Sequence, residues 1–309
     1  MNFRNSKSGK DKHMKLTFLT DNKTEDVRCR AEWGLSILIE TEGHKYLYDT
    51  GASGMFAENA AAIGAVLTDV EACMISHGHY DHTQGVPEFV KLNDHAPVYI
   101  HKDALHESYA EGEDENCGMQ WPEGFAETNS DRLVLSSGVT KVSDRLTLVG
   151  DIPSYDDYPP TEKFFMPVKS GMMGKLDVPA PGGTESVKAK RSIESDGMVQ
   201  DTMNHEQFLV VDEGDRIHII SGCCHKGAVP TIRYAKELFP GRRIASFTGG
   251  MHTYMFDRAA REKLAAEMSS YGVEKVLPLH CTGMNMIVTF KEKMGDACIV
   301  ACAGDTVEL

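Results

Sequence analysis

Short apolar segments with the alternation of β-strands recur along the chain. Residues 35–40 and 45–48 flank the turn residues 41–44, which predicts a hairpin. Several later segments are apolar throughout, as is typical of buried strands, and segments of helical character lie between some of them. Strands are expected at residues 14–19, 35–40, 45–48, 70–76, 208–211, 216–220, 243–248 and 273–279, and helices at 55–62, 86–92 and 103–111. Such a mixture is typical of the α/β class.

This pattern is lost in two parts of the chain. Residues 1–13 are polar and show no periodicity, so we expect a flexible extension or an expression remnant, followed by one folded domain at residues 14–309. Residues 151–204 contain Pro159-Pro160 and the run Pro-Ala-Pro-Gly-Gly at 179–183. A long irregular stretch inside a compact domain is usually functional or disordered, so we expect a cap-like insertion or lid at 151–204.

Composition limits the classes of function. With 309 residues, of which 41% are hydrophobic, the chain can bury a sizeable core. The formal net charge of −14 argues against nucleic acid as a partner, because a nucleic-acid channel needs clustered Lys and Arg. No apolar run reaches the length of a membrane span and no secretory signal is evident, so we expect a cytoplasmic protein without a membrane partner. The eight cysteines form no CxxC pair, which favours reduced thiols.

The segment Ser76-His77-Gly78-His79-Tyr80-Asp81-His82 carries the strongest chemical signal. It places three imidazoles and a carboxylate within six consecutive positions, directly after an apolar strand. Imidazole nitrogen and carboxylate oxygen are ligands for Zn²⁺, and Fe or Mn would also accept them. His77 and His79 can turn toward one ion, whereas Asp81 and His82 can serve a second ion nearby. The alternative is a polar surface turn that is rich in histidine.

Three later strands also end in loops that contain glycine and histidine. The strand at 216–220 is followed by His225, which would complete a centre of three histidines with His77 and His79. The other two strands are followed by His252 and by His280-Cys281-Thr282-Gly283. Histidines placed at random in a core would not favour strand ends so consistently, so we interpret these loops as parts of one metal site.

Together these segments resemble the His-x-His-x-Asp-His signature of the metallo-β-lactamase superfamily. The resemblance implies a four-layer αββα sandwich with one or two metals at its edge, with His280 joining Asp81 and His82 at the second metal. A more specific resemblance is to the branch of 7,8-dihydropterin-6-methyl-4-(β-D-ribofuranosyl)-aminobenzene-5′-phosphate synthase-like proteins. It is carried by Gly34-Leu35-Ser36, Tyr48-Asp49-Thr50-Gly51, the histidine-rich segment, His205-Glu206-Gln207, and the loops that contain His225, His252 and His280.

The chain departs from the superfamily in one respect. Most members with two metals have a bridging Asp after the strand that ends here in Gly249-Gly250-Met251-His252, and this loop contains no acid. His252 could act as a ligand in its place, donate a proton near the metals, or be merely structural. The absence of the acid puts tight binding of both metals in question.

Four further residues are candidates for support around the ligands. The resemblance implies that Asp49 holds the ligand loops, although an Asp in this position also caps helices. His205 and Glu206 precede a strand that leads to the site, where they could orient ligands or substrate, or simply begin the strand. Cys281 adjoins His280.

This ligand set predicts a metal-dependent hydrolase. A divalent ion lowers the pKa of the water that it binds, which favours attack on a small ester, lactone, amide or phosphoester. We expect two ions, with zinc the leading candidate, and a small-molecule substrate that could be phosphorylated. Asp81, as a ligand that orients the nucleophile, and His252, as a proton donor, are the candidate catalytic residues.

Two other functions remain open. One is the transfer reaction of the named branch, in which an aniline-type nucleophile displaces diphosphate from an activated pterin. Its phosphate would need cations, which the insertion could supply from Lys169, Lys175, Lys188, Lys190 and Arg191. The other is a di-iron redox or ligand-binding protein, although the sequence shows no flavodoxin-like segment for electron transfer. The oligomeric state is also open.

Overall fold

The computed structural model describes residues 14–160, 162–167, 193–194 and 197–309. The predicted extension at residues 1–13 lies outside the described residues. So do the five cations between Lys169 and Arg191 that could bind phosphate in a transfer reaction.

The amino-terminal half is built on a seven-stranded mixed sheet, in the order β17-β1-β2-β3-β4-β5-β7. The alternating segments form antiparallel neighbours, and the apolar run at residues 70–76 forms β4, which pairs in parallel with β3 and β5. The predicted hairpin is confirmed as β2 and β3. The strands are β1 (Lys15–Thr20), β2 (Ser36–Thr41), β3 (His44–Tyr48), β4 (Ala72–Met74), β5 (Val98–His101), β7 (Leu133–Ser136) and β17 (Thr306–Glu308).

A second sheet of six strands has the order β16-β15-β14-β13-β9-β8. Its strands β14, β15 and β16 run parallel, so their carboxyl ends lie at the same edge. The strands are β8 (Val139–Lys141), β9 (Leu146–Val149), β13 (Phe208–Asp212), β14 (Arg216–Ser221), β15 (Arg243–Gly249) and β16 (Val276–Pro278).

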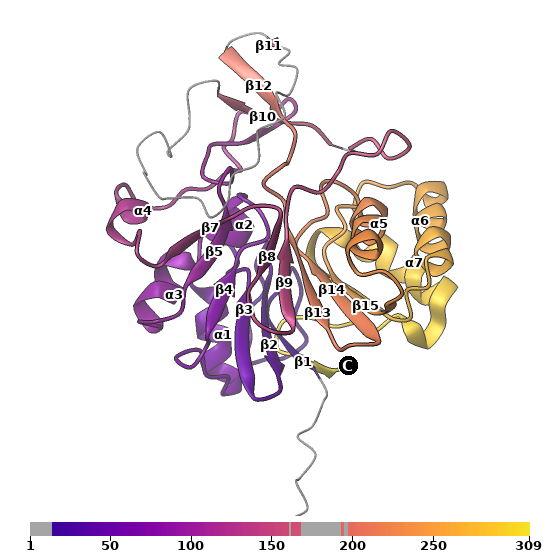
Figure 1. Ribbon diagram of the computed structural model, residues 1–309, viewed down its shortest axis with the longest axis horizontal. Helices are drawn as coiled ribbons and strands as arrows, with labels where there is room; N and C mark the ends of the chain where they lie inside the picture. The colour runs from indigo at the N-terminus through magenta and orange to yellow at the C-terminus, as the bar shows by residue number, and fades with distance from the viewer. Residues whose placement is uncertain (1–13, 161, 168–192, 195–196) are drawn as a thin grey trace, which may run out of the picture.

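Helices cover the outer face of each sheet, which gives four layers (Figure 1). The first sheet carries α1 (Met55–Ile63) and α3 (Val86–Leu92), and the short α2 (Tyr80–Thr83) and α4 (Phe125–Thr128) lie in loops beside it. The second sheet is covered by α5 (Ala228–Leu238), α6 (Arg258–Ser270) and α7 (Met284–Met294). Two single 3₁₀ turns, η2 (His280–Thr282) and η3 (Gly295–Ala297), precede and follow α7. The predicted αββα architecture is confirmed.

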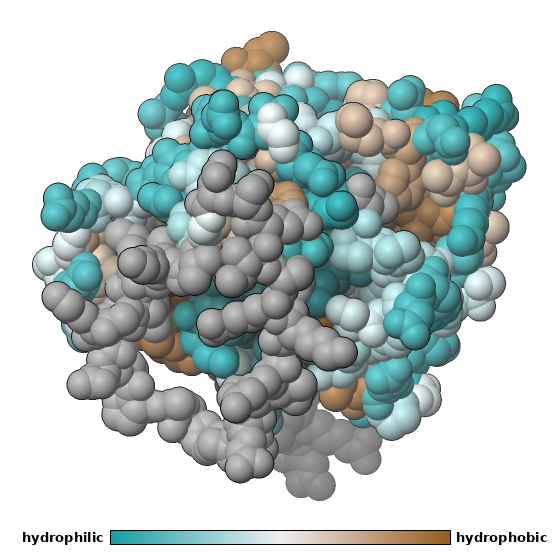
Figure 2. Space-filling view, turned by 90° about the horizontal axis from the view of Figure 1, so that it is seen from above, coloured by the Kyte–Doolittle hydropathy of each residue, from teal (hydrophilic) through white to brown (hydrophobic). Residues whose placement is uncertain are grey.

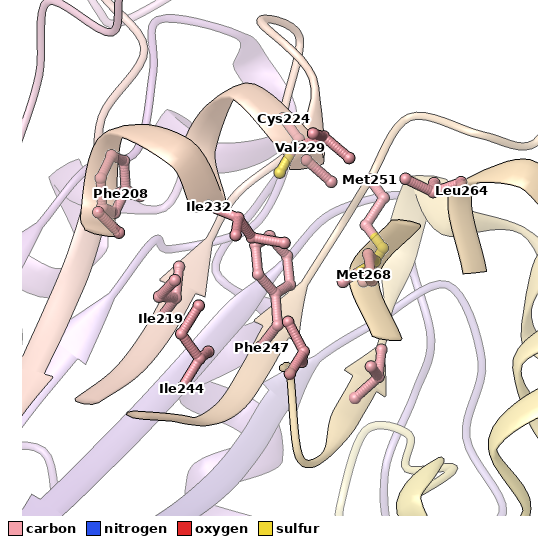
Figure 3. Close-up of a cluster of buried hydrophobic side chains, with 14 of the residues drawn as sticks. Phe208, Ile219, Cys224, Val229, Ile232, Ile244, Phe247, Met251, Leu264 and Met268 are labelled. Carbon is pink, nitrogen blue, oxygen red and sulfur yellow. The ribbon is translucent and has the colours of Figure 1, made fainter. Parts of the chain in front are cut away.

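Alternate side chains of β13 point to opposite faces of its sheet, so this strand contributes to two hydrophobic clusters. Phe208 and Val210 lie in the cluster between the second sheet and its helices, whereas Leu209 and Val211 lie in the cluster between the two sheets. Figure 3 shows the first of these clusters, in which Phe247 of β15 packs with side chains of the covering helices. A third cluster lies between the first sheet and α1 and α3. Both faces of each sheet are therefore buried, as the continuous apolar runs predict.

A small sheet lies above the sandwich, on the side of α2 (Figure 1). Its four strands are β6 (Tyr109–Ala110), β10 (Phe164–Pro167), β11 (Ile193–Glu194) and β12 (Met198–Asp201). Three of these strands fall in the segment 151–204, so the described part of the expected insertion contributes β10, β11 and β12 to this sheet. Its function as a cap or lid stays a prediction.

The predicted helix at residues 103–111 is wrong. These residues form a loop and strand β6, which pairs with β10. Ser108 also accepts a hydrogen bond from the backbone of Cys117, and His106 contacts Asp201 of β12. Contacts with distant segments thus outweigh a local helical pattern. In the described part of the chain, every helix is too short or too polar to cross a membrane.

Candidate metal centre

The loops that follow β4, β14, β15 and β16 meet at one edge of the sandwich. Parallel pairing within each sheet brings the carboxyl ends of these strands together, and each loop carries at least one histidine. The loop after β4 turns through Gly78, where a Cβ atom would lie 2.2 Å from the carbonyl oxygen of Ala104. Only glycine fits there, and it lets the backbone between His77 and His79 pass close to Ala104.

The first group of ligands consists of His77, His79 and His225. The ligand nitrogens of the three side chains lie within 4.8 Å of one another. All three rings are buried, and among the described residues none of their Nε2 atoms has a hydrogen-bond partner. Three converging imidazole nitrogens without partners would be costly unless they bind an ion, so this group fits a divalent metal.

Burial also sets the protonation state of these histidines. Together with the neighbouring imidazoles, it holds the pKa of His77 and His225 well below the usual value. The pKa of His79 is lowered to about 3, again chiefly by burial. Neutral imidazole is the form that binds metal, so the three histidines of this first group can bind an ion at neutral pH without losing a proton.

The second group consists of Asp81, His82 and His280. Asp81 Oδ2 lies 3.1 Å from His280 Nε2 and 3.7 Å from His82 Nε2, and all three side chains are buried. The short helix α2 starts directly after His79 and presents Asp81 and His82 together. The structure thus brings six predicted residues together in the two groups that the sequence predicts, and their role as ligands stays a prediction.

Asp49 lies beneath both groups. Its carboxylate accepts hydrogen bonds from the backbone N–H and the hydroxyl of Ser76, each at 2.7 Å, and from Nδ1 of His82 at 2.6 Å. Burial alone would lower the pKa of His82, but the carboxylates of Asp81 and Asp49 raise it to about 9. Asp49 therefore orients the His82 ring and leaves its Nε2 facing the second group, which is the usual arrangement of a carboxylate behind a ligating histidine.

His205 and Glu206 hold the ligand loops through the backbone. The N–H of Gly78 donates to Nδ1 of His205 at 3.1 Å. The carboxylate of Glu206 accepts from the N–H groups of His225 and Lys226, at 2.6 and 2.8 Å, and burial raises the pKa of Glu206 to about 7. Both residues act on the backbone of the loops that carry the ligands.

Sequence reasoning missed a buried pair behind His205. Asp201 accepts hydrogen bonds from Nε2 of His205 at 3.1 Å and from Nε2 of His106 at 2.9 Å. Nδ1 of His106 also donates to the carbonyl of Asp103, so both ring nitrogens carry a proton and His106 is a cation. The two residues are 95 positions apart, and no local pattern connects them.

His252 lies beside the first group. Its ring centroid is 4.4 Å from that of His225, and its Nε2 contacts the carboxylate of Glu162 in the segment 151–204. The sequence did not indicate Glu162. The role of His252 as ligand, proton donor or structural residue stays a prediction.

The two cysteines beside His225 face in different directions. Cys224 packs in the core under the second sheet's helices and contacts Ser221 Oγ. Cys223 instead lies in the site, with Sγ 3.1 Å from His82 Nε2 and 3.2 Å from Sγ of Cys281. Cys281, which was expected near the ligands, thus contacts Cys223. Sequence reasoning did not single out Cys223, although cysteine is a strong metal ligand.

Aromatic rings border this polar centre. The ring of Phe164, from β10, lies 4.7 Å from that of His79 and 4.9 Å from that of His225. Near the second group, Trp33 is 47% exposed and its ring lies 5.3 Å from that of His280. Figure 2 looks down on the molecule from above, and the described surface there is mainly hydrophilic with separate hydrophobic areas.

Comparisons with known proteins point to one family. A family model described as the metallo-beta-lactamase superfamily matches residues 34–242. An uncharacterised protein from Methanocaldococcus jannaschii is 24% identical over 279 residues, which cover 90% of this chain and 94% of that protein. Another protein from the same organism, named 7,8-dihydropterin-6-methyl-4-(beta-D-ribofuranosyl)-aminobenzene-5′-phosphate synthase, is 23% identical, and the match covers 85% of each chain.

Solved structures agree with these matches. Tm1679, described as a metal-dependent hydrolase of the beta-lactamase superfamily, is 25% identical with a TM-score of 0.75, and the match covers 96% of this chain and 99% of that chain. YhfI from Bacillus subtilis, a metallo-beta-lactamase fold protein, is 11% identical with a TM-score of 0.54, over 96% of this chain and 100% of that chain. Since the family model matches more than half of the chain, and the structure has that fold and groups of side chains able to hold divalent metal, this chain belongs to the metallo-β-lactamase superfamily.

Proposed function

We propose that the chain is a metal-dependent hydrolase with two metal ions, acting on a small molecule with an ester, lactone, amide or phosphoester bond. The observation that carries this proposal is the pair of adjacent ligand groups, His77, His79 and His225 beside Asp81, His82 and His280. Nitrogen and oxygen donors of this kind favour zinc, with iron and manganese as alternatives. The likeness to Tm1679, which is described as a metal-dependent hydrolase, supports the same reaction class.

Each side chain of the site has its own role in this proposal. Bound divalent ions supply a water nucleophile at neutral pH and neutralise charge that develops on the substrate. Asp81 faces His280 and His82, so its carboxylate can hold a metal and orient the nucleophile. His252, in contact with Glu162, can carry a proton at the border of the first group. Phe164 covers His79 and His225 and keeps water from that side.

A second candidate is the transfer reaction, and the relative named as a synthase favours it. A diphosphate leaving group would need cations near the metals. Lys226 is a buried cation in the loop that carries His225, but its Nζ already donates to Ser154 and Asn204. A hydrolase needs no residue beyond the two ligand groups, so we place hydrolysis first.

The test combines metal content with turnover. We would purify the protein without chelators, measure bound metal by elemental analysis, and assay ester, lactone and phosphodiester substrates. We expect about two ions per chain, and about one in each of the variants His77→Ala and His280→Ala, with turnover lost in both. His95→Ala is the matched control, because the exposed ring of His95 contacts the neighbouring carboxylate of Asp94, and the backbone N–H that donates to Asn93 is kept in the variant.

Other outcomes would redirect the assignment. Two bound metals without hydrolysis of any substrate class, but with diphosphate released from an activated pterin, would favour the transferase. Iron as the resident metal, with a redox signal, would favour the redox alternative. Metal content near zero in the wild-type protein would contradict the proposal.

A further inference from the structure

The coordination of the second metal lacks a residue that most two-metal members of the superfamily have. Its three predicted ligands are Asp81, His82 and His280, whereas zinc prefers at least four ligands. The loop after β15 contains Gly250, Met251 and His252, and none of these is an acid. Water commonly takes the fourth position in a catalytic zinc site, but any further protein ligand for this metal would come from another loop.

Cys223, in the loop after β14, occupies this place. Its Sγ lies 3.1 Å from His82 Nε2, and the ligand atoms of Cys223 and His280 lie within 4.8 Å of each other. Two further separations in the set are 3.1 Å between Asp81 Oδ2 and His280 Nε2, and 3.7 Å between Asp81 Oδ2 and His82 Nε2, and the ligand atoms of His82 and His280 lie within 4.8 Å of each other. Ligand atoms on a tetrahedral zinc ion are about 3.5 Å apart, so these four donors can surround one ion.

The same sulfur also faces the first group. Cys223 forms one set with His77 and His82, and another with His225 and His252, in each of which the ligand atoms lie within 4.8 Å of one another. Because cysteine has a single Sγ, that atom lies between the two groups of ligands. This is the position at which a residue shared by two ions would lie.

We propose that the thiolate of Cys223 is the fourth protein ligand of the metal held by Asp81, His82 and His280. Binding releases the thiol proton to solvent and forms a metal–sulfur bond, with no change in oxidation state. Sulfur is a soft ligand, so this centre would select zinc over magnesium or manganese. The inference rests on metal binding in the proposed function and does not depend on which bond is hydrolysed.

Cys281 is placed to support this thiolate. Its S–H donates toward Sγ of Cys223 at 3.2 Å, while its own sulfur accepts from the backbone N–H of His252 at 3.3 Å. A donor beside a metal-bound thiolate stabilises its negative charge. We therefore assign Cys281 as a positioning residue and Cys223 as the ligand.

The test replaces the resident metal with Co²⁺, because a thiolate bound to Co²⁺ gives a charge-transfer band in the near ultraviolet. We expect this band in the wild-type protein and its loss in Cys223→Ser, together with a fall from about two ions to about one. Cys281→Ser should keep the band with a shifted position. Cys117→Ala is the control, because Cys117 is a partly buried cysteine whose thiol bonds to the carbonyl of Ser108.

Cys223→Asp keeps the inference testable if the serine variant folds poorly. This variant restores an acid, so it should bind about two ions without the charge-transfer band. A band that persists in both Cys223 variants, or that is lost in Cys281→Ser instead, would overturn the inference. Two ions and hydrolysis without any sulfur band would refute the Cys223 ligand but leave the proposed function intact. A sulfur band without hydrolysis would support the Cys223 ligand and contradict the proposed function.

Discussion

Asp49 is the residue on which the orientation of His82 depends. Its carboxylate takes one hydrogen bond from the His82 ring and two from Ser76, so each oxygen is occupied. Ser76 also contacts Nδ1 of His77 at 2.9 Å, which connects Asp49 to the first group of ligands. One carboxylate thereby sets the ring orientation in both groups.

Asp49→Asn should weaken metal binding without unfolding the protein. The amide has a similar shape, but only its oxygen can accept hydrogen bonds. Its NH₂ group would face a donor, so the variant cannot accept all the hydrogen bonds that Ser76 and His82 donate to Asp49. We expect the affinity of the second metal to fall by about 10- to 100-fold, measured by competition with a chromophoric chelator. Asp69→Asn, which removes an exposed carboxylate paired with Lys45, should leave the affinity unchanged. Unchanged affinity in Asp49→Asn would mean that Asp49 serves only the turn.

At the scale of elements, the predicted ligands lie in turns that follow the strands, and several residues of these turns have a left-handed backbone conformation. Asp49, Cys224, His252 and His280 all have positive φ, between 47° and 57°, at or just after the end of a strand. Such conformations are costly for residues other than glycine and cluster at functional sites. Gly249 shows how close the strands come, because a Cβ atom there would lie 1.9 Å from the carbonyl oxygen of Ser221.

Gly249→Ala should therefore separate the loops that follow β14 and β15. Gly241→Ala is the matched control, since Gly241 also has positive φ but a Cβ atom added there would meet no neighbouring atom within 4 Å. We expect the control to cost about 1 kcal/mol of the free energy of unfolding, and Gly249→Ala at least about 3 kcal/mol more. Urea unfolding of both metal-free proteins measures the difference. Equal costs would show that the two strands can move apart freely.

At the scale of the whole molecule, the site joins the two halves of the sandwich. Four of the predicted ligands, His77, His79, Asp81 and His82, follow a strand of the first sheet, whereas His225 and His280 follow strands of the second. The core between the sheets, with Phe18 and Ile37 packed in one cluster with Leu209 and Ile220, therefore fixes the distance between the ligands.

Asp201 attaches the small upper sheet to this sandwich, since it lies in β12 and bonds to His106 and His205. Although burial opposes both shifts, His205 and His106 lower the pKa of Asp201, and Asp201 raises the pKa of His106. A raised histidine pKa stabilises the fold fully below the unfolded value of about 6.5, and this contribution is lost as pH rises through the folded value. The lowered pKa of Asp201 stabilises above about pH 4, so the pair contributes most between these limits.

Asp201→Asn should cost about 3 kcal/mol near pH 6 because it leaves the buried charge of His106 without a partner. The cost should shrink as the pH rises through the raised pKa of His106, because the ring is neutral above it. Thermal unfolding of the metal-free proteins across this range is the measurement. Asp144→Asn, which removes an exposed pair with Lys141, should change stability little at any pH. A cost that does not depend on pH would contradict the assignment of His106 as a cation.

Much of the architecture follows from local pattern. The hairpin, the buried strands and the helices at 55–62 and 86–92 were predictable because periodicity and turn residues are properties of adjacent residues. The six candidate ligands were predictable for a similar reason, since four lie within one short segment and the others directly follow apolar strands. The conformation of residues 103–111 was not predictable in this way, because pairing of β6 with β10 replaces the local helix.

The sequence by itself therefore determined the fold class, eight strands of the two large sheets and the residues able to bind metal, because these depend on spacing along the chain. Only the tertiary structure decided which neighbour of His225 faces the site, since the positive φ of Cys224 directs that side chain into the core and leaves Cys223 beside His82. It also decided the contacts of Glu162 with His252 and of Asp201 with His106. These pairs come from distant segments, and their geometry exists only once the sheets have packed.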